Sequence, residues 1–472
     1  MRVPRDYDSP RGAKARLALI RHRSTDPARR IGTLFYNPGG PGGAGVDVLP
    51  QILDFFPAAL RARFDIVSWD PRGVGESSAV QCFSDLEAEL RFLDGTTVGE
   101  GFPVGKAEQR DWIRRYRAFG PRCARRNRDL LRHVGTADTA RDLNLLRRAV
   151  GDPKLNYLGV SYGTFLGATY ANLFPRRVRA MTLDGNIDPR SWVHRRLRAN
   201  GGTFLPTFLR QLSDEGLAKT ISAFLGRCGS TGTASCAFSA GSAKETTEKW
   251  ARLLSRLPTD SAGTDTSYPE LFSQTAAGLY VSARWPDTAK RIQDVEETGA
   301  ASRPAPAPTP GILFEGRAGV PNAGRYAGPE QGISVFCSES PNPEAAAFPS
   351  LARLAHERSG PAGSFWTWYA EVCADWPARA ADRYAGPWDR RTASPVLVIG
   401  NTHDPATPYT GSQAIARQLA RGRLLKVKGY GHTTLFNPST CASDYEGHYF
   451  VDGKLPPKGA VCHQDPKPFS AP

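Results

Sequence analysis

Apolar runs of strand length recur in the first part of the chain and return near its end. Nearly continuous runs predict buried strands at 31–36, 64–69, 155–160 and 179–184, and a looser alternation predicts an outer strand at 16–22. Helical spacing predicts one helix from Thr136, with Thr136 as N-cap and Asp138 in the first turn, and another running to about Phe174. Alternating strands and helices predict a parallel sheet covered on both faces.

This regularity fades after Pro189. Helical segments are expected at 204–226, 243–256 and 286–297, an extended surface loop at the Pro/Ala stretch 303–310, and a long loop between Cys82 and Cys123. Buried strands resume at 395–400 and 424–427, and the second of these is expected to be the last strand. We therefore predict an α/β fold, with a doubly wound, mostly parallel sheet and an inserted, largely helical cap. The division is a first core part (1–189), a cap (190–390) and a C-terminal core part (391–472).

Three candidate catalytic residues each follow a predicted strand. Ser161 lies in the Gly-x-Ser-x-Gly sequence that links the 155–160 strand to the next helix. Flanking glycines suit a sharp turn that exposes a strained serine, although a plain turn can have the same sequence. Asp404 follows the 395–400 strand and His432 follows the 424–427 strand. Because ligands bind where the carboxyl ends of parallel strands meet, we expect these side chains at one edge of the sheet.

The residue types fit nucleophilic catalysis. A serine hydroxyl attacks a carbonyl only after a base takes its proton, and an imidazole titrates in the range that this task needs. A carboxylate then fixes the imidazole tautomer and stabilises its cation. The order Ser161, Asp404, His432 is the one found in α/β hydrolases, and the neighbouring His403 would break that order. Each residue alone could be an ordinary loop residue, but together they predict a triad.

A glycine-rich segment, 37–45, ends the 31–36 strand. Its open backbone N–H groups could bind a phosphate or an oxyanion. The segment lacks the Gly-Lys-Ser/Thr ending of a P-loop and the Gly-x-Gly-x-x-Gly spacing of dinucleotide sites. We therefore predict an oxyanion hole made by the N–H groups of Gly40 and Tyr162, with no cofactor and no metal.

Eight cysteines occur with only two methionines, and no C-x-x-C pair is present. An even number spread through loops favours disulfides and an oxidising compartment, although eight reduced, buried thiols would also fit. The simplest pairing is sequential: Cys82–Cys123, Cys228–Cys236, Cys337–Cys373 and Cys441–Cys462. The first residues contain no apolar signal-peptide region. We expect a secreted protein whose signal peptide is not part of this chain.

The net charge of +15 at pH 7 raises nucleic acid as a partner. The arginines are scattered, however, without interleaved aromatic residues, so we expect a solvated basic surface and no nucleic-acid binding. No apolar run reaches the roughly 18 residues of a membrane span. We expect a monomer.

Seven motifs give the chain a family resemblance. They are Asn37-Pro-Gly-Gly-Pro-Gly42, Trp69-Asp-Pro-Arg-Gly-Val-Gly-Glu-Ser77, Gly159-Val-Ser-Tyr-Gly163, Leu183-Asp-Gly185, Cys373-Ala-Asp-Trp-Pro377, Asp404-Pro-Ala-Thr-Pro408 and Gly431-His432. From about Val3 to Cys462 the chain resembles the secreted bacterial tripeptidyl aminopeptidases, which are α/β-hydrolase serine peptidases related to proline iminopeptidases. The resemblance implies nucleophile Ser161, acid Asp404, base His432 and export. Family members usually have additional residues before the segment at Val3-Pro4, together with a signal peptide.

The resemblance also implies peptide substrates with a free N-terminus, cleaved a few residues from that end. Such an exopeptidase needs a partly desolvated carboxylate to bind the substrate ammonium group. Glu339 is the preferred candidate and Glu371 and Asp375 are the others, although a solvated acid is the ordinary alternative for each. A secreted carboxylesterase with the same triad and a non-catalytic binding protein of the same fold remain alternatives.

Overall fold

The structure is a computed structural model that describes residues 1–97, 99–194, 204–259, 266–300, 326–465 and 467–469. Its centre is an eight-stranded sheet with the order β10-β9-β8-β7-β6-β4-β5-β3. The strands are β3 (Leu19–His22), β4 (Gly32–Asn37), β5 (Phe64–Trp69), β6 (Leu155–Val160), β7 (Val178–Asp184), β8 (Val396–His403), β9 (Gly422–Tyr430) and β10 (Val461–His463). Neighbouring strands are parallel except the edge strand β3, which is antiparallel to β5. A small ribbon pairs β1 (Arg2–Pro4) with β2 (Lys14–Arg16).

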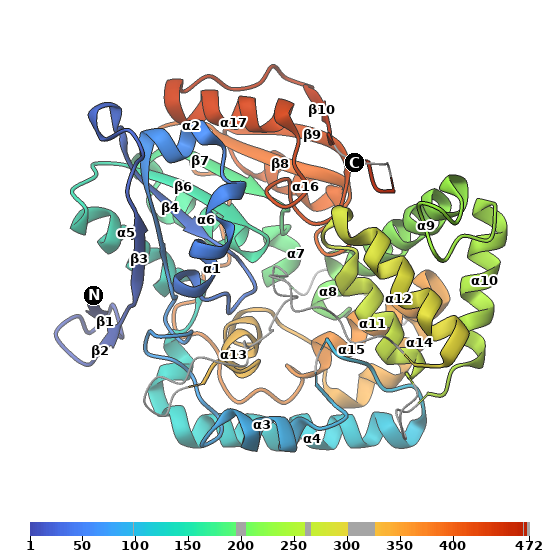
Figure 1. Cartoon of the computed structure of the whole chain (residues 1–472). Helices are drawn as coiled ribbons and strands as arrows, with labels where there is room; N and C mark the ends of the chain where they lie inside the picture. Colours follow the sequence, from blue (N-terminus) through green and yellow to red (C-terminus); the bar gives the residue numbers. More distant parts are fainter. Residues whose placement is uncertain (98, 195–203, 260–265, 301–325, 466, 470–472) are drawn as a thin grey trace.

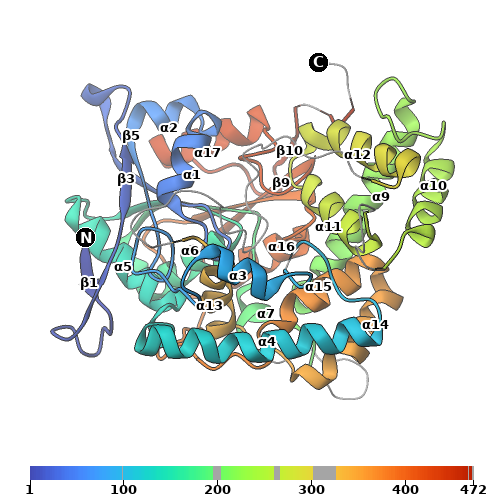
Figure 2. The same cartoon turned by 60° about the horizontal axis from the view of Figure 1, so that its bottom comes forward.

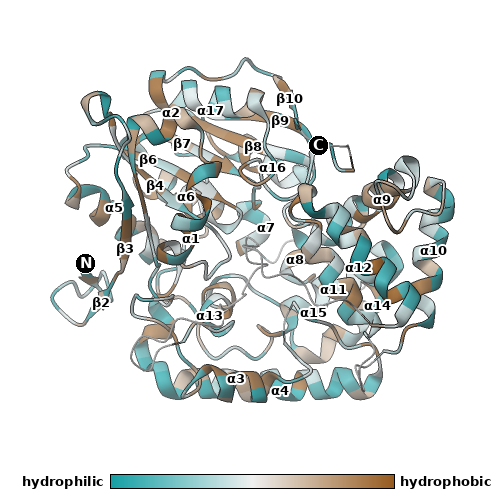
Figure 3. Ribbon diagram, viewed as in Figure 1, coloured by the Kyte–Doolittle hydropathy of each residue, from teal (hydrophilic) through white to brown (hydrophobic). Residues whose placement is uncertain are grey.

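Helices cover both faces of this sheet, as the alternating pattern predicted. Apolar residues of one face pack against α1 (Gly45–Ile52), α2 (Ala58–Arg63) and α17 (Thr440–Asp452). The other face packs against α5 (Thr136–Ala149), α6 (Tyr162–Leu173) and α16 (Tyr409–Gln418). Figure 1 shows these helices around the strands, and Figure 3 shows hydrophobic colouring concentrated in the strands. Burial on both faces explains why the central strands are continuous apolar runs.

Two details of the predicted core are wrong. The last strand is β10, which pairs in parallel with β9 at the sheet edge. A three-residue strand is too short to show a period, and the Cys441–Cys462 disulfide joins it to α17. The N-cap of α5 is Gly135 and not Thr136, which is the first helical residue. The Thr136 hydroxyl donates instead to Glu339, at 2.6 Å.

A helical layer lies between β7 and β8 in the sequence. Its described helices are α7 (Pro189–Val193), α8 (Thr207–Arg210), α9 (Ser213–Thr231), α10 (Ala243–Arg256), α11 (Tyr268–Gly278), α12 (Trp285–Thr298), α13 (Glu330–Glu339), α14 (Phe348–Ser359) and α15 (Pro361–Glu371). Figure 2 shows them beside the sheet, as expected of an inserted cap. The predicted loop at 303–310 lies outside the described residues. Among the helices of the described chain, none has both the length and the hydrophobicity for a membrane crossing.

The long loop expected between Cys82 and Cys123 is wrong. This segment forms α3 (Leu86–Leu93) and the 22-residue α4 (Lys106–Asn127), which lie against the helical layer in Figures 1 and 2. The Trp112 ring of α4 packs edge-on against the Trp368 ring, with centroids 6.5 Å apart. The centroids of the Phe119 and Trp376 rings are 6.2 Å apart. Chain from before β6 therefore packs against the helical layer.

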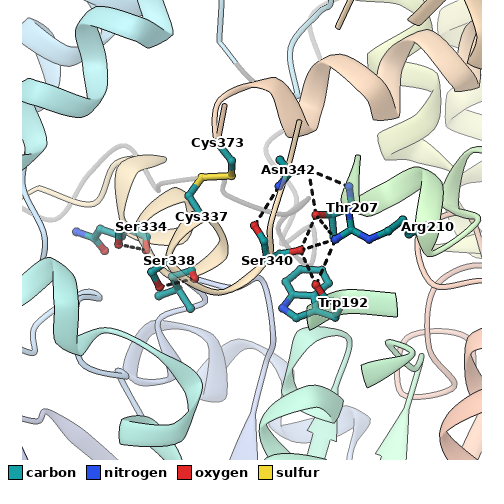
Figure 4. The surroundings of a disulfide bond; sticks show 11 residues. Trp192, Thr207, Arg210, Ser334, Cys337, Ser338, Ser340, Asn342 and Cys373 are labelled. Carbon is teal, nitrogen blue, oxygen red and sulfur yellow. Dashed lines mark hydrogen bonds between the residues drawn. A yellow bond between two sulfur atoms is a disulfide. The ribbon is translucent and has the colours of Figure 1, made fainter. Parts of the chain in front are cut away.

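The eight cysteines form Cys82–Cys123, Cys228–Cys236, Cys337–Cys373 and Cys441–Cys462, the sequential pairing predicted from the sequence. Figure 4 shows the Cys337–Cys373 bond, which joins α13 to the turn after α15. Beyond α13, the Ser340 hydroxyl donates to the Trp192 carbonyl at 2.7 Å and contacts the Thr207 hydroxyl at 2.5 Å. One buried network therefore connects α7, α8 and the end of α13.

Two fully buried carboxyl groups meet where α3 packs against the start of α13. A methyl group placed on Gly328 would lie 2.0 Å from Glu89 Oε2 and 2.1 Å from Glu330 Oε2, so the two side chains converge there. Among the ion pairs of the described residues, none includes either glutamate. Burial raises the pKa of both groups, that of Glu330 to about 7, and mutual repulsion adds to the rise for Glu89. Folding therefore favours the protonated carboxyl groups, and ionisation of Glu330 costs stability.

We expect Glu330→Gln to stabilise the protein at alkaline pH. An acid whose pKa rises on folding contributes stability below its ordinary value of about 4.5, and this contribution is lost as the pH rises through about 7. The amide cannot ionise, so the free energy of unfolding at pH 9 should increase by roughly 2 kcal/mol, with little change at pH 5. Denaturant unfolding without reductant measures this. Glu357→Gln, at an exposed site of α14, is the control. Equal pH slopes for wild type and Glu330→Gln would contradict the prediction.

Candidate active site

Ser161 lies in a sharp turn between β6 and α6. Its φ of 57° and ψ of −127° are strained for a residue with a side chain. The turn depends on its flanking glycines, because a methyl group on Gly159 would lie 2.4 Å from the Gly163 carbonyl and one on Gly163 would lie 2.8 Å from the Asn37 carbonyl. The Ser161 N–H donates to Asp184 O at 2.9 Å. Within the described residues the Ser161 hydroxyl makes no hydrogen bond, including none to His432, and Ser161 is 7 % exposed.

The glycine-rich segment after β4 packs directly against this turn. A methyl group on Gly39 would lie 2.8 Å from Ser161 Cβ and 3.1 Å from the Tyr162 nitrogen. Gly39 and Gly40 both have positive φ, at 86° and 106°. Tyr162 is the first residue of α6, where an N–H group has no carbonyl one turn earlier to bind. Of the two predicted oxyanion donors, Gly40 therefore belongs to a segment that packs against the Ser161 turn, and Tyr162 is the residue after Ser161.

Asp404 and His432 are paired at the neighbouring strand ends. His432 Nδ1 lies 2.9 Å from Asp404 Oδ2 and 3.0 Å from Oδ1. A carboxylate can only accept hydrogen bonds, so the proton lies on Nδ1 and the Nε2 lone pair is free. Asp404 Oδ1 also accepts from the N–H groups of Ala406 and Thr407, both at 2.9 Å, and the Thr407 hydroxyl donates to Oδ2 at 3.0 Å. Both side chains are at least 95 % buried.

Several contacts hold the loop that carries His432. The His432 N–H donates to Tyr280 O at 2.8 Å, and the Tyr280 ring packs edge-on against the imidazole with centroids 5.1 Å apart. The Asp184 carboxylate accepts from the Thr434 N–H at 2.6 Å and from its hydroxyl at 2.9 Å. Because Asp184 O also accepts the Ser161 N–H, one residue at the end of β7 joins the serine turn to the histidine loop.

Burial raises the pKa of Asp184 to about 6, although its bonds to Thr434 and the nearby His432 oppose this shift. His403, the rival histidine, stacks on Tyr430 with centroids 4.8 Å apart, and burial lowers its pKa. It belongs to the end of β8, whereas His432 is the histidine that contacts Asp404.

The preferred ammonium-binding candidate, Glu339, is 1 % exposed at the end of α13. Its carboxylate accepts the N–H and the hydroxyl of Thr136, and the Thr136 hydroxyl also contacts that of Tyr162. Tyr162 is the residue after Ser161, so Glu339 is connected to the serine turn through Thr136 and Tyr162. Burial raises its pKa to about 7.

Glu371, the last residue of α15, and Asp375 lie beside α4. Asp375 pairs with Arg117 at 3.0 Å and is partly exposed. Glu371 is 2 % exposed, and burial raises its pKa to about 8, with the Asp375 charge as the next cause. Within the described residues, no hydrogen bond or ion pair joins either side chain to the Ser161 turn or the His432 loop.

Two site residues were missed by sequence reasoning although both lie in motifs that were recognised. Thr407 is part of the Asp404-to-Pro408 motif and Asp184 is part of the Leu183-to-Gly185 motif. Thr407 was detectable, because a hydroxyl three residues after a loop aspartate commonly bonds to it. The bond from Asp184 to the histidine loop crosses 250 residues and has no local signature.

A parallel sheet with a strained serine turn, an acid loop and a histidine loop at the ends of successive strands is the architecture of an α/β hydrolase. The family described as alpha/beta hydrolase fold matches residues 32–227, and the family described as TAP-like protein matches residues 359–462.

Three curated relatives match almost the whole chain. Serine protease Hip1 of Mycobacterium tuberculosis is 31 % identical over 98 % of this chain and 86 % of its own length. Tripeptidyl aminopeptidase of Streptomyces lividans is 29 % identical over 99 % of this chain and 84 % of its own length. Carboxylesterase B of Mycobacterium tuberculosis is 31 % identical, with coverage of 98 % and 85 %. The chain belongs to the tripeptidyl aminopeptidase family of α/β hydrolases and is an enzyme of the hydrolase class.

Proposed function

We propose that this protein is a serine exopeptidase that hydrolyses peptide bonds near the free N-terminus of its substrates, with Ser161 as nucleophile, His432 as base and Asp404 as acid. The observation that carries this proposal is the hydrogen bond of 2.9 Å between His432 and Asp404. The loop that carries His432 is bonded to Asp184, which also accepts the N–H of Ser161 in the strained turn. The relatives named as a serine protease and a tripeptidyl aminopeptidase support peptide substrates.

In the proposed reaction the Ser161 oxygen attacks the carbonyl carbon of the scissile bond while His432 Nε2 takes the hydroxyl proton. Asp404 stabilises the resulting imidazolium through Nδ1. Collapse of the tetrahedral intermediate breaks the C–N bond, and the imidazolium gives its proton to the departing amine. Water, deprotonated by His432, then hydrolyses the acyl-enzyme and frees Ser161.

The N–H groups of Gly40 and Tyr162 are the proposed donors to the oxyanion. Both belong to backbone that packs around the Ser161 turn, so the donors are fixed before the substrate arrives. Preorganised donors of this kind stabilise the charge that develops on the carbonyl oxygen without a reorganisation cost at the moment of reaction.

Binding of the substrate ammonium group is assigned to Glu339 in this proposal. Of the three carboxylates considered, its contacts alone lead through Thr136 to the residue beside the nucleophile. Because burial raises the pKa of Glu339 to about 7, the carboxyl becomes neutral as the pH falls below that value. KM for free-amine peptides should therefore rise as the pH falls below about 7, while KM for N-blocked peptides should not show this rise.

A panel of chromogenic substrates tests the function. It contains a tripeptide amide with a free amine, its N-acetylated form and a simple acyl ester. We expect kcat/KM for the free tripeptide to exceed that for the blocked form by about tenfold or more, since losing a charged hydrogen bond costs roughly 1.5–3 kcal/mol. Glu339→Gln should raise KM for the free peptide only. Equal kinetics on both peptides would remove the exopeptidase assignment.

Carboxylesterase activity is the second candidate, because a relative bears the name carboxylesterase B and the same triad serves any acyl transfer. Faster turnover of the ester than of every peptide in the panel would favour it. The four disulfides support an extracellular location, where such bonds persist. The division into core (1–189 and 391–472) and cap (190–390), and the monomeric state, stay predictions.

A further inference from the structure

A row of cations runs along the outer side of α4. Lys106, Arg110, Arg114, Arg117 and Arg125 are all exposed, and at 100° per residue they fall within an arc of about 100° over roughly 28 Å of helix. We call these five residues the basic ridge. Further exposed arginines flank it: Arg122, Arg126, Arg128 and Arg132. From Lys106 to His133 the sequence has ten Lys and Arg residues against three Asp and Glu residues, a net charge of +7 of the +15 of the whole chain.

The ridge is held rigidly. The opposite side of α4 is buried through Trp112, Tyr116 and Phe119 against the helical layer, and Cys123 is bonded to Cys82. Figure 2 shows α4 as one long helix at the edge of the molecule, and Figure 3 colours much of it hydrophilic. The backbone positions that carry the cations are therefore set before any partner binds.

This arrangement is unfavourable for the helix itself. Lys106 and Arg110, and Arg110 and Arg114, are like-charge pairs four residues apart, and such pairs slightly destabilise a helix. Arg114 and Arg117 are partly neutralised by Asp111 and Asp375. Within the described residues, no ion pair engages Lys106, Arg110 or Arg125. A charge pattern that works against local stability, and that leaves three of its five cations without an ion pair among the described residues, is typical of a functional surface.

We propose that the basic ridge binds a linear polyanion that carries phosphate groups along its length, and thereby holds the enzyme at an extracellular polymer. A straight row of fixed cations matches a linear array of anions better than a single compact ligand. The exposed ridge positions contain no aromatic residue, on which the bases of single-stranded nucleic acid would stack, and no large apolar residue that would enter a lipid bilayer. This inference does not depend on the proposed peptidase activity.

Long-chain inorganic polyphosphate is the probe, and binding is followed by fluorescence anisotropy on the full chain. If about five phosphates are contacted, raising the salt from about 50 to 200 mM should weaken polyphosphate binding roughly 100-fold. The triple variant Lys106→Glu, Arg110→Glu and Arg125→Glu should weaken binding at least about tenfold, since it replaces three of the five ridge cations by carboxylates.

The matched control is Arg148→Glu, Arg176→Glu and Arg177→Glu, three exposed arginines on the α/β core with the same change in net charge. It should bind polyphosphate nearly as the wild type does, and both variants should keep the wild-type unfolding temperature and the wild-type rate on whichever chromogenic substrate is turned over. Absence of binding at about 50 mM salt, or equal weakening in both variants, would overturn the proposal. Ridge-dependent binding to phosphatidylglycerol vesicles but not to polyphosphate would also overturn it, because the partner would then be a lipid surface.

Discussion

Ser161→Ala should reduce kcat on peptide and ester substrates by about 10⁶-fold. The substitution removes the only atom proposed to form the covalent intermediate, while the backbone donors and the pocket remain. Residual turnover should then come from binding and oxyanion stabilisation alone. The turn itself should persist, because it depends on Gly159 and Gly163 and not on the hydroxyl. Steady-state kinetics and labelling by a phosphonate probe measure the two consequences.

Ser350→Ala, at an exposed serine of α14, is the matched control and should keep full activity. Both variants should unfold at the wild-type temperature without reductant, which would show that any loss of activity is chemical. Substantial activity in Ser161→Ala, or phosphonate labelling that survives in it, would place the nucleophile elsewhere and end the serine mechanism proposed for this site.

Asp404→Asn should lower kcat by about 10⁴-fold and change KM little. The asparagine oxygen can still accept the N–H groups of Ala406 and Thr407, which bind Oδ1 in the structure, so the loop should keep its shape. At the Oδ2 position an amide group would point donors at His432 Nδ1 and at the Thr407 hydroxyl. The imidazole would then carry its proton on Nε2 and could not accept one from Ser161.

Asp389→Asn, at an exposed position of the segment before β8, is the control and should be silent. The comparison to make is kcat across pH 5–9 together with the unfolding temperature of both variants. A fall of less than tenfold in Asp404→Asn, with the fold intact, would show that another group orients His432. Asp184 would then be the residue to test, since its carboxylate is the other one bonded to the histidine loop.

The sheet could be predicted because burial on both faces makes its strands continuous apolar runs. β5 and β6 have the predicted bounds, β4 is shifted by one residue, β7 begins one residue earlier, and β8 begins one residue later and ends three residues later than predicted. The short strand β10 was not predicted, because three residues are too few to show an alternating pattern. Helix α4 was not predicted for a different reason. Its buried residues Trp112, Tyr116, Phe119 and Cys123 do have helical spacing, but the arginines around them and an internal Pro121 hid it.

The candidate catalytic residues were recognisable because local chemistry marks them. A serine between glycines, and an acid and a histidine just after apolar strands, are patterns that need no knowledge of distant contacts. The ammonium-binding candidates were not of this kind. Sequence position alone could not show that Glu339 is buried beside Thr136 and Tyr162, or that Asp375 pairs with Arg117 on α4. Those differences follow from packing between segments far apart in the chain.

The sequence by itself determined the sheet, the order of Ser161, Asp404 and His432, and the even number of cysteines. Each of these can be recognised from residue types that are close together in the chain. Tertiary structure alone decided that Asp184 would join the serine turn to the histidine loop, that Glu89 and Glu330 would meet in the buried interior, and that the row of cations on α4 would be exposed. The physical reason is that burial and pairing depend on which elements pack together, and packing is a property of the whole chain.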